Sequence, residues 1–522
     1  MGTFLEDRDR TVIPRLRSFR TTLLLGELDP AGLDYGGDSE SLEDEESSLE
    51  SKIVAWNERG TVSFAADLVS AALVLGQPDR AKDAAEFLLS RKSQAPHAAR
   101  QVAKKILELQ PADGRRAVAT VEVSLPHEKE IYQRIHSVRQ QLGNEPRNAI
   151  LWVELSRVYA FLGLAEKAEH AMDVAVGLGP TNRFILRSAS RLYVHVDELG
   201  KAHKVLQRAQ STKYDPWLLS AEIAAASAAA RTSRFVKTGQ RMLLDDSLSP
   251  FQKNELASAI ATLELSHGKV KSGRNLLRQA LLDPTENSVA QAEWALRKRY
   301  VEPLGLDLER IKNETPRSFE ARAWGHYSSL RWKEALHASF DWVRDQPFSA
   351  RPVFFGSYVA GSLLEDYRSC ERIIEIGLRA NPDQPILLND LAFVYASAGE
   401  IDKAEERFRR IDHGEIKDLR LAIAMTATKG LLRFRRGFDV EGRALYRAAI
   451  ENAKKHRLHR ATAIASIYLA REEVLSKSVE AKKAQELALH ETQNVTDPDI
   501  KQIFENAFGS ADLVDTERRS QG

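Results

Sequence analysis

Apolar and small residues alternate at helical spacing between residues 149 and 182. In the first half they form one stripe along a predicted helix, made of Trp152, Leu155, Tyr159 and Leu162. Gly163 interrupts this stripe. A second helix is predicted from a further stripe, made of Ala168, Met172 and Ala175. Pro180 then stands where the second helix is expected to end. The pattern predicts a helical hairpin.

Prolines recur at almost constant spacing in the first half of the chain. They are 35, 34, 36, 34 and 34 residues apart, at Pro111, Pro146, Pro180, Pro216, Pro250 and Pro284. Because proline cannot continue a helix, each is expected where a helix ends. Residues 183–216 and 251–284 keep the apolar frame of the first hairpin, whereas 217–250 is rich in alanine and degenerate. A chain of 522 residues is long for one globular core, so we expect a linear array of hairpins.

The residue order in 149–182 resembles a tetratricopeptide repeat, a helical hairpin of about 34 residues. The match departs from the family at Met172, where an aromatic residue is usual. Residues 385–418 give the next clearest match, through Leu388, Leu391, Ala392, Tyr395, Gly399, Ala404 and Phe408. The resemblance implies an all-α fold, a right-handed α-solenoid of about eight tetratricopeptide or similar hairpins, with a non-solenoid arm at the amino terminus.

We expect the chain to divide along its length into segments of different pattern. These are an arm and acidic linker (1–52), hairpins similar to the repeat (53–145), a first array (146–300), a hinge or irregular connection (301–316), a second array (317–456), capping helices (457–496) and a polar tail (497–522). The hinge is expected at the Pro303 turn cluster, and 117–125 is the one segment expected to be extended. The arm either caps the solenoid or docks a partner. From Asp497 onward we expect fraying or disorder.

The resemblance also implies where a ligand would bind. In the family, the first helix of each hairpin lines a concave groove. Carried over to this sequence, the groove positions are Arg157, Phe161, Phe184, Arg187, Arg191 and His195. Guanidinium groups bind carboxylates and phosphates bidentately, so these positions suit a peptide with an acidic or carboxylate-bearing segment. The alternative is a solvated helix face whose arginines pair with neighbouring glutamates. Val153 and Arg157 replace residues with which some family members hold a peptide carboxylate, so that specificity does not carry over.

Charge is balanced overall, with 75 basic and 74 acidic residues, so no global field draws the protein to nucleic acid or anionic lipid. A local basic surface is nevertheless present near the carboxyl end. It comprises Arg433, Arg435, Arg436, Lys454, Lys455, Arg457 and Arg460, together with His456 and His459. Some helical-repeat proteins contact nucleic acid through such surfaces, which makes a nucleic-acid accessory factor the alternative function.

Sequence motifs for catalysis, phosphate binding and metal binding are lacking. Cys370, the single cysteine, stands at a small-residue position of its repeat and is expected to pack rather than react. His456 and His459 have a spacing that a metal could use but no further ligand nearby, and we expect no metal and no cofactor. We expect core packing for the tryptophans Trp294, Trp324, Trp332 and Trp342.

These observations predict a non-catalytic scaffold that binds a protein or peptide partner, as an accessory, adaptor or sensor subunit of a larger complex. No signal-peptide core or membrane span is evident, and one cysteine fits a reducing compartment, so we expect a cytoplasmic protein.

Overall fold

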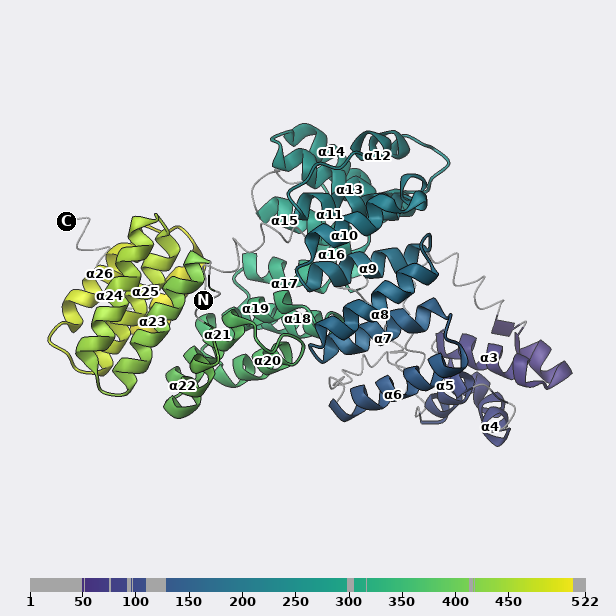
Figure 1. Ribbon diagram of the computed structural model, residues 1–522, viewed down its shortest axis with the longest axis horizontal. Coiled ribbons are helices and arrows are strands. Elements are labelled where there is room, and N and C mark those ends of the chain that lie inside the picture. Colours follow the sequence, from purple (N-terminus) through teal and green to yellow (C-terminus); the bar gives the residue numbers. More distant parts are fainter. Residues whose placement is uncertain are drawn as a thin grey trace. The chain divides into compact units, whose positions relative to one another are not determined.

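The structure is a computed structural model that describes residues 49–50, 52–74, 77–91, 95, 97–108, 128–297, 305–315, 317–412, 416 and 418–509. Within these ranges the regular elements are helices, and no strand occurs (Figure 1). The predicted all-α fold is therefore confirmed. Most of the amino-terminal arm and its acidic linker, the expected extended segment 117–125, the turn at Pro303 and the tail beyond residue 509 lie outside the described residues.

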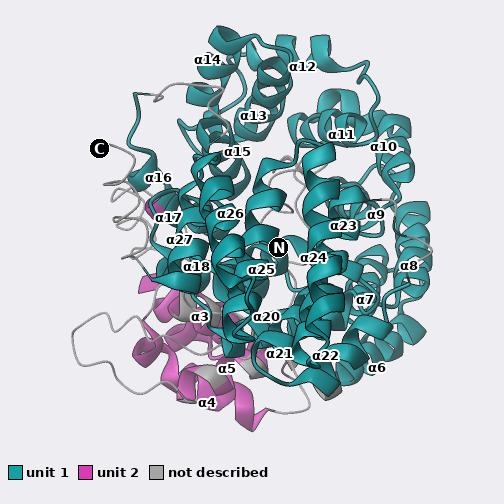
Figure 2. Ribbon diagram, turned by 90° about the vertical axis from the view of Figure 1, so that its left-hand side faces the viewer, with its two compact units in different colours: residues 1–20, 125–312, 318–522 teal, residues 21–124, 313–317 magenta. Residues whose placement is uncertain are grey.

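The chain forms two compact units, which Figure 2 shows in different colours. Unit 2 covers residues 21–124 and 313–317. Residues 52–59 are helical and are followed by α3 (Val62–Val74), the 3-10 helix η3 (Pro78–Ala81), α4 (Lys82–Ser90) and α5 (His97–Glu108). Ala65 and Leu68 of α3 and Ala85 of α4 are buried in its core.

Unit 1 covers residues 1–20, 125–312 and 318–522 and contains the repeats. It begins, among the described residues, with α6 (Glu128–Asn144). Four hairpins follow: α7 (Ala149–Phe161) with α8 (Ala165–Leu178), α9 (Arg183–His195) with α10 (Leu199–Arg208), α11 (Pro216–Ala228) with α12 (Val236–Leu243), and α13 (Pro250–Ser266) with α14 (Val270–Ala280). Single helices α15 (Glu286–Arg297) and α16 (Leu308–Glu314) come next.

The second half of unit 1 continues the same construction. Its hairpins are α17 (Phe319–Ser328) with α18 (Trp332–Asp345), α19 (Ala350–Tyr358) with α20 (Tyr367–Ala380), α21 (Pro385–Ser397) with α22 (Ile401–Arg409), α23 (Leu419–Arg435) with α24 (Asp439–Lys455), and α25 (His459–Leu475) with α26 (Ala481–Gln493). A short π-helix, η5 (Val359–Leu363), extends α19, and the last described helix is α27 (Pro498–Phe508).

The periodic prolines mark the boundaries of the repeats, but two of them do so differently from the prediction. Pro216 and Pro250 are the first residues of α11 and α13 rather than the end of a helix. Backbone N–H groups in the first turn of a helix have no hydrogen-bond acceptor within the helix. Proline, which lacks this N–H, is therefore compatible with that position. The preceding residues, Asp215 and Ser249, cap both helices by accepting hydrogen bonds from backbone N–H groups.

Each hairpin turns through a residue with left-handed backbone geometry. In the two clearest repeats this residue is glycine, with φ of 67° at Gly163 and 87° at Gly399. The same place in other repeats is taken by Asp197 and Leu330, with φ of 63° and 59°. Non-glycine residues in this region cost about 1 to 2 kcal/mol. The packed helices on either side therefore fix the turn even where the sequence does not favour it.

Small residues let the two helices of a hairpin cross closely. Ala168, Ala202 and Ala404 are fully buried at these crossings. The hydroxyl of Ser156 on α7 donates to the carbonyl oxygen of Ala168 on α8 at 2.6 Å. In the α23–α24 hairpin, a Cβ built on Gly430 would lie 3.0 Å from the carbonyl oxygen of Gly442. Backbone atoms thus approach too closely there for larger side chains.

Described helices on either side of the expected hinge region pack against one another. α15 packs against α17, and the Lys312 ammonium on α16 lies 3.0 Å from the Glu293 carboxylate on α15. Trp294, Trp324 and Trp342 are buried, which confirms packing as their role. Trp332 is partly buried and donates to the Gln502 side chain at 3.2 Å. Both predicted arrays belong to one compact unit.

The expected fraying from Asp497 onward is wrong for residues 498–508, which form α27. Ile500, Ile503 and Phe504 of this helix are buried in the core of the second half of unit 1. The segment is polar in composition, but its apolar residues fall on one helical face. Such a face stabilises a terminal segment once it finds a surface to cover.

We predict that enlarging a crossing residue destabilises the protein. Replacing Ala168 or Ala404 with Trp should lower the free energy of unfolding by about 1 to 3 kcal/mol or more, because overpacking forces the backbones apart. The control is Glu166→Trp, at an exposed position of α8, which should change it by less than about 0.5 kcal/mol. Chemical denaturation followed by circular dichroism measures both, and equal losses would contradict the assigned repeat frame.

Candidate functional site

Arg157, the first predicted groove residue, is buried rather than exposed. Only 6% of its surface is accessible. Its guanidinium holds the Glu154 carboxylate through two hydrogen bonds, of 2.7 and 3.1 Å, and Arg134 on α6 donates to the same carboxylate at 3.2 Å. Burial alone would raise the pKa of Glu154, but the two arginines outweigh it and hold the pKa below its ordinary value. Arg157 is therefore engaged within the protein.

Arg187 and Arg191, on α9, are also engaged. A guanidinium nitrogen of Arg187 donates to the Glu255 carboxylate on α13 at 2.6 Å, and the group lies 5.0 Å from the centre of the Trp217 ring. Arg191 is partly buried and also has an interaction within the chain. The arrangement corresponds to the alternative in which arginines pair with glutamates, although the partner of Arg187 stands 68 residues away.

The aromatic groove residues contact another part of unit 1. The rings of Phe161 and His195 lie 5.6 and 5.4 Å from the ring of Phe348, which follows α18. Burial lowers the pKa of His195 to about 4, so the imidazole is neutral at pH 7. Phe184 is partly buried and packs against the same core cluster. The structure brings Phe161 and His195 together, but around an internal side chain.

Most of the predicted basic surface is neutralised by acidic neighbours. Arg435 donates to Glu472 at 2.9 Å, Arg436 bonds to Asp402 and Glu405, and Arg460 bonds to Asp499 at 2.7 Å. Ion pairs also join Lys454 to Glu491 and Arg433 to Glu441, at 2.8 and 3.3 Å. Lys455 and Arg457 are exposed. A surface paired in this way offers a nucleic-acid backbone few cations.

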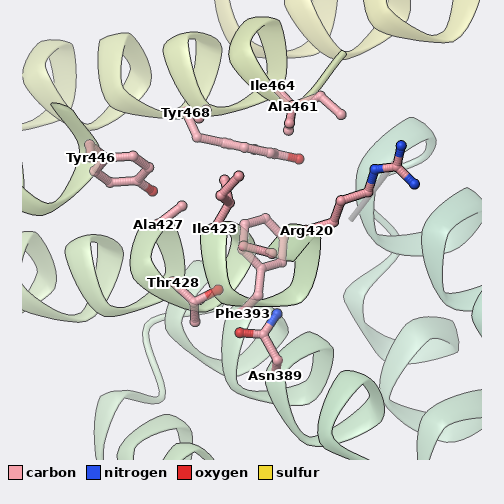
Figure 3. Close-up of a pocket in the computed structure, with 12 residues that line it drawn as sticks. Asn389, Phe393, Arg420, Ile423, Ala427, Thr428, Tyr446, Ala461, Ile464 and Tyr468 are labelled. Atoms are coloured by element: carbon pink, nitrogen blue, oxygen red, sulfur yellow. The ribbon is translucent and has the colours of Figure 1, made fainter. Parts of the chain in front are cut away.

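A pocket lies between the first helices of three successive hairpins, α21, α23 and α25. It is a cavity of about 50 Å³ within an open recess of about 540 Å³. Figure 3 shows Phe393, Ile423 and Tyr468 pointing toward one another, with Asn389 beneath Phe393 and the Arg420 guanidinium directed away from them. The rings of Phe393 and Tyr468 meet edge to face, with centroids 5.0 Å apart. The walls are therefore mainly aromatic and aliphatic.

Asn389 is the polar group that distinguishes this pocket. Its side chain is 2% exposed, and its Oδ1 atom has no hydrogen-bond partner. A buried amide oxygen without a partner is costly, by roughly 1 to 3 kcal/mol. Burial also raises the pKa of Tyr468 to about 12 and that of Tyr446 well above its ordinary value. Both phenols are therefore uncharged at neutral pH, and the pocket offers an acceptor in an apolar surround.

The sequence contained a signal for this pocket that our assignment did not use. Asn389 and Phe393 stand in the repeat that begins at residue 385 where Arg187 and Arg191 stand in the repeat that begins at residue 183, and the family resemblance assigns these positions to the groove. We applied that rule to the repeats at 149 and 183 only. Ile423 and Tyr468 carried no comparable signal, because they meet Phe393 only after three hairpins have stacked.

The single cysteine and the histidine pair named in the sequence analysis do not form a reactive or metal-binding site in the described residues. Cys370 is fully buried, and burial raises the pKa of its thiol well above the ordinary value, which confirms a packing role. His456 and His459 are exposed. The part of the chain that the structure describes contains no group of three or more His, Cys, Asp or Glu side chains able to hold a metal ion. Among the described helices, none combines the length and apolar character that a membrane span needs.

Comparison with known proteins gives distant similarities in fold. No protein-family model matches the sequence, and no curated protein matches it. Solved structures that match include a human IFIT1 dimer with PPP-AAAA (16% identity, 74% of this chain and 95% of that chain, TM-score 0.36). Yeast Tom70 matches at 13% identity over 75% and 96% of the two chains, with a TM-score of 0.30. The APC/C hetero-tetramer Cut9–Hcn1 matches at 12% identity over 95% and 100%, with a TM-score of 0.36. At these identities and TM-scores the similarities concern the fold alone and carry no information about a ligand.

We predict that Arg187→Glu destabilises the fold, because it leaves the buried Glu255 carboxylate facing a second carboxylate. Breaking a buried ion pair costs about 3 to 5 kcal/mol. The control is Arg139→Glu, at an exposed position of α6, which should have little effect. Denaturant unfolding of the two variants provides the comparison. An unchanged midpoint for Arg187→Glu would show that the Glu255 pair does not contribute, and that Arg187 is available to an external anion.

Proposed function

We propose that this protein is a non-catalytic helical-repeat scaffold that holds a partner protein in the pocket between α21, α23 and α25. The observation that carries the proposal is the Asn389 amide oxygen, which is buried and without a partner at the wall of an apolar recess. A partner segment that inserts an apolar side chain and donates one backbone N–H would satisfy both features.

The energetics of the pocket fit recognition of a single anchoring side chain. Each CH₂ group of an apolar side chain that is buried there contributes about 0.8 kcal/mol. A hydrogen bond to Asn389 removes the penalty of its unpaired oxygen and gives the contact direction. Because the walls come from three stacked hairpins, they are already ordered before the partner arrives, which lowers the entropic cost of binding.

The side chains around the pocket support binding rather than catalysis. Tyr446 and Tyr468 stay protonated at neutral pH, and the charged end of Arg420 points away from the apolar centre. We infer an accessory, adaptor or sensor subunit that positions a partner within a larger complex. A cytoplasmic location remains part of the proposal, on the basis of the single cysteine.

Two alternative binding surfaces remain as proposals from the sequence. A carboxylate of a partner that binds Arg157, Arg187 or Arg191 would have to compete with interactions within the chain. Examples are the hydrogen bonds of Arg157 with Glu154 and of Arg187 with Glu255. A nucleic acid at the carboxyl-terminal basic surface would find Lys455 and Arg457 exposed but the neighbouring arginines paired. A high ratio of absorbance at 260 to 280 nm in the purified protein would favour the nucleic-acid function over the pocket.

We predict that filling the pocket abolishes partner capture. Ala427 lines the recess on α23 and is partly exposed, so Ala427→Phe should occupy the space with little effect on stability. The abundance of proteins that co-purify with the wild type through the pocket should be at least tenfold lower with the variant, as measured by quantitative mass spectrometry. Ala444→Phe, at an exposed position of α24, is the matched control and should retain them. Retention of every partner by a folded Ala427→Phe variant would refute the pocket as the binding site.

A further inference from the structure

We propose that α27 is an exchangeable ligand carried by the chain itself, and that the slot it fills recognises a helical segment of a partner with an acidic residue followed by apolar residues at positions +1, +4 and +5. The slot is formed by η5, α25 and α26, and Tyr327 of α17 and Tyr358 of α19 contribute hydrogen bonds to it. In the resident helix the pattern is supplied by Asp499, Ile500, Ile503 and Phe504. This inference goes beyond the proposed function of the pocket and does not depend on it.

The acidic residue is held by groups from three first helices of hairpins. The Asp499 carboxylate, only 2% exposed, accepts hydrogen bonds from the Tyr327 hydroxyl on α17 at 2.7 Å and from the Tyr358 hydroxyl on α19. Arg460 on α25 binds both of its oxygens, at 2.7 and 3.1 Å. Residues that are 141 and 172 positions away in sequence thus converge on one carboxylate.

These contacts keep Asp499 ionised despite its burial. Burial acts to raise its pKa, but the hydrogen bonds and charge of Arg460, together with the two tyrosine hydroxyls, outweigh it and hold the pKa below the ordinary value. The slot is therefore built for a carboxylate rather than for a neutral group. Charge-assisted hydrogen bonds of this kind are about twice as strong as neutral ones.

The remaining contacts of α27 are those of a docked amphipathic helix. Ile500, Ile503 and Phe504 belong to the same core cluster as Tyr358 and Leu363. At the far end, the Asn506 amide donates to the carbonyl oxygens of Ser362 and Leu363 at 3.3 and 3.0 Å. These carbonyls lie in the π-helix η5, an irregular element of the kind often found at functional sites. Lys501, on the outer face, is exposed.

The slot sets a requirement on anything that replaces α27. If the whole segment of α27 leaves, the hydroxyl of the buried Tyr358 and the guanidinium of Arg460 lose Asp499, and Arg460 also loses Asp497, which lies 2.9 Å away. Leaving buried donors and charges unpaired is strongly unfavourable, so an apolar helix alone cannot take the place. Only a segment that brings its own carboxylate restores these bonds. The resident helix thus defines the chemistry of the partner that can displace it.

The test uses the full-length chain and a fluorescent peptide of residues 495–509. Asp499→Asn in the protein should weaken the resident helix, so that the labelled peptide binds this variant at least tenfold more tightly than it binds the wild type, by anisotropy. A peptide with the same Asp499→Asn change should bind at least tenfold more weakly than the natural peptide, and a Lys501→Ala peptide should bind unchanged. Asp246→Asn, at an exposed turn, is the control protein and should behave as the wild type.

A second measurement does not require a variant. In hydrogen exchange of the wild type, amides of α27 should exchange at least tenfold faster than those of α25, because an exchangeable helix opens without global unfolding. Equal protection of α27 and α25, or failure of a folded Asp499→Asn protein to bind the peptide, would show that α27 is a permanent cap of the solenoid. Partner capture by the pocket is measured separately, so either proposal can fail without the other.

Discussion

The close crossing of the two helices in each hairpin is the constraint on which the rest of this structure depends. Fully buried Ala168, Ala202, Ala335, Cys370 and Ala404 occupy the same place in different repeats. Where two glycines meet, as at Gly430 and Gly442, even a Cβ would clash. Protein interiors are packed too densely to absorb larger groups at such points. Because the crossings fix the helix pairs, they also fix the spacing of the first helices that line the candidate sites.

Once the positions of the first helices are fixed, few orientations are open to their polar side chains. Several carry buried acids that bind a cation from another repeat, as Glu255 binds Arg187, Glu320 binds Arg351 and Glu472 binds Arg435. Such pairs add little net stability, but breaking one leaves a buried charge without a partner. They therefore favour one register of stacking over others. They also explain why an arginine-rich sequence does not produce an open anion-binding groove here.

The sequence predicted what depends on neighbouring residues and missed what depends on distant ones. Helical periodicity located the hairpins, because apolar spacing and turn residues act over a few positions. The prolines at 216 and 250 were assigned to the wrong side of a boundary, since proline is compatible both with the loop after one helix and with the first turn of the next. The arrangement of Asp499, Tyr327 and Tyr358 could not be predicted, because no local rule links residues so far apart. The groove positions implied by the family resemblance could have identified Asn389. Its lack of a hydrogen-bond partner can be seen only in the three-dimensional structure.

The pocket and the slot of α27 share a structural element, so we expect occupancy of one to affect the other. The Tyr468 hydroxyl, at the pocket, is hydrogen-bonded to the side chain of Ser362, and the backbone oxygen of the same residue accepts from Asn506 of α27. Ser362 belongs to the π-helix, whose hydrogen bonds are already irregular. A shift of this element on one side therefore alters a contact on the other. Thermodynamic linkage makes any such effect mutual: a pocket ligand that favours the docked α27 is itself favoured by it, and one that disfavours it is weakened to the same degree.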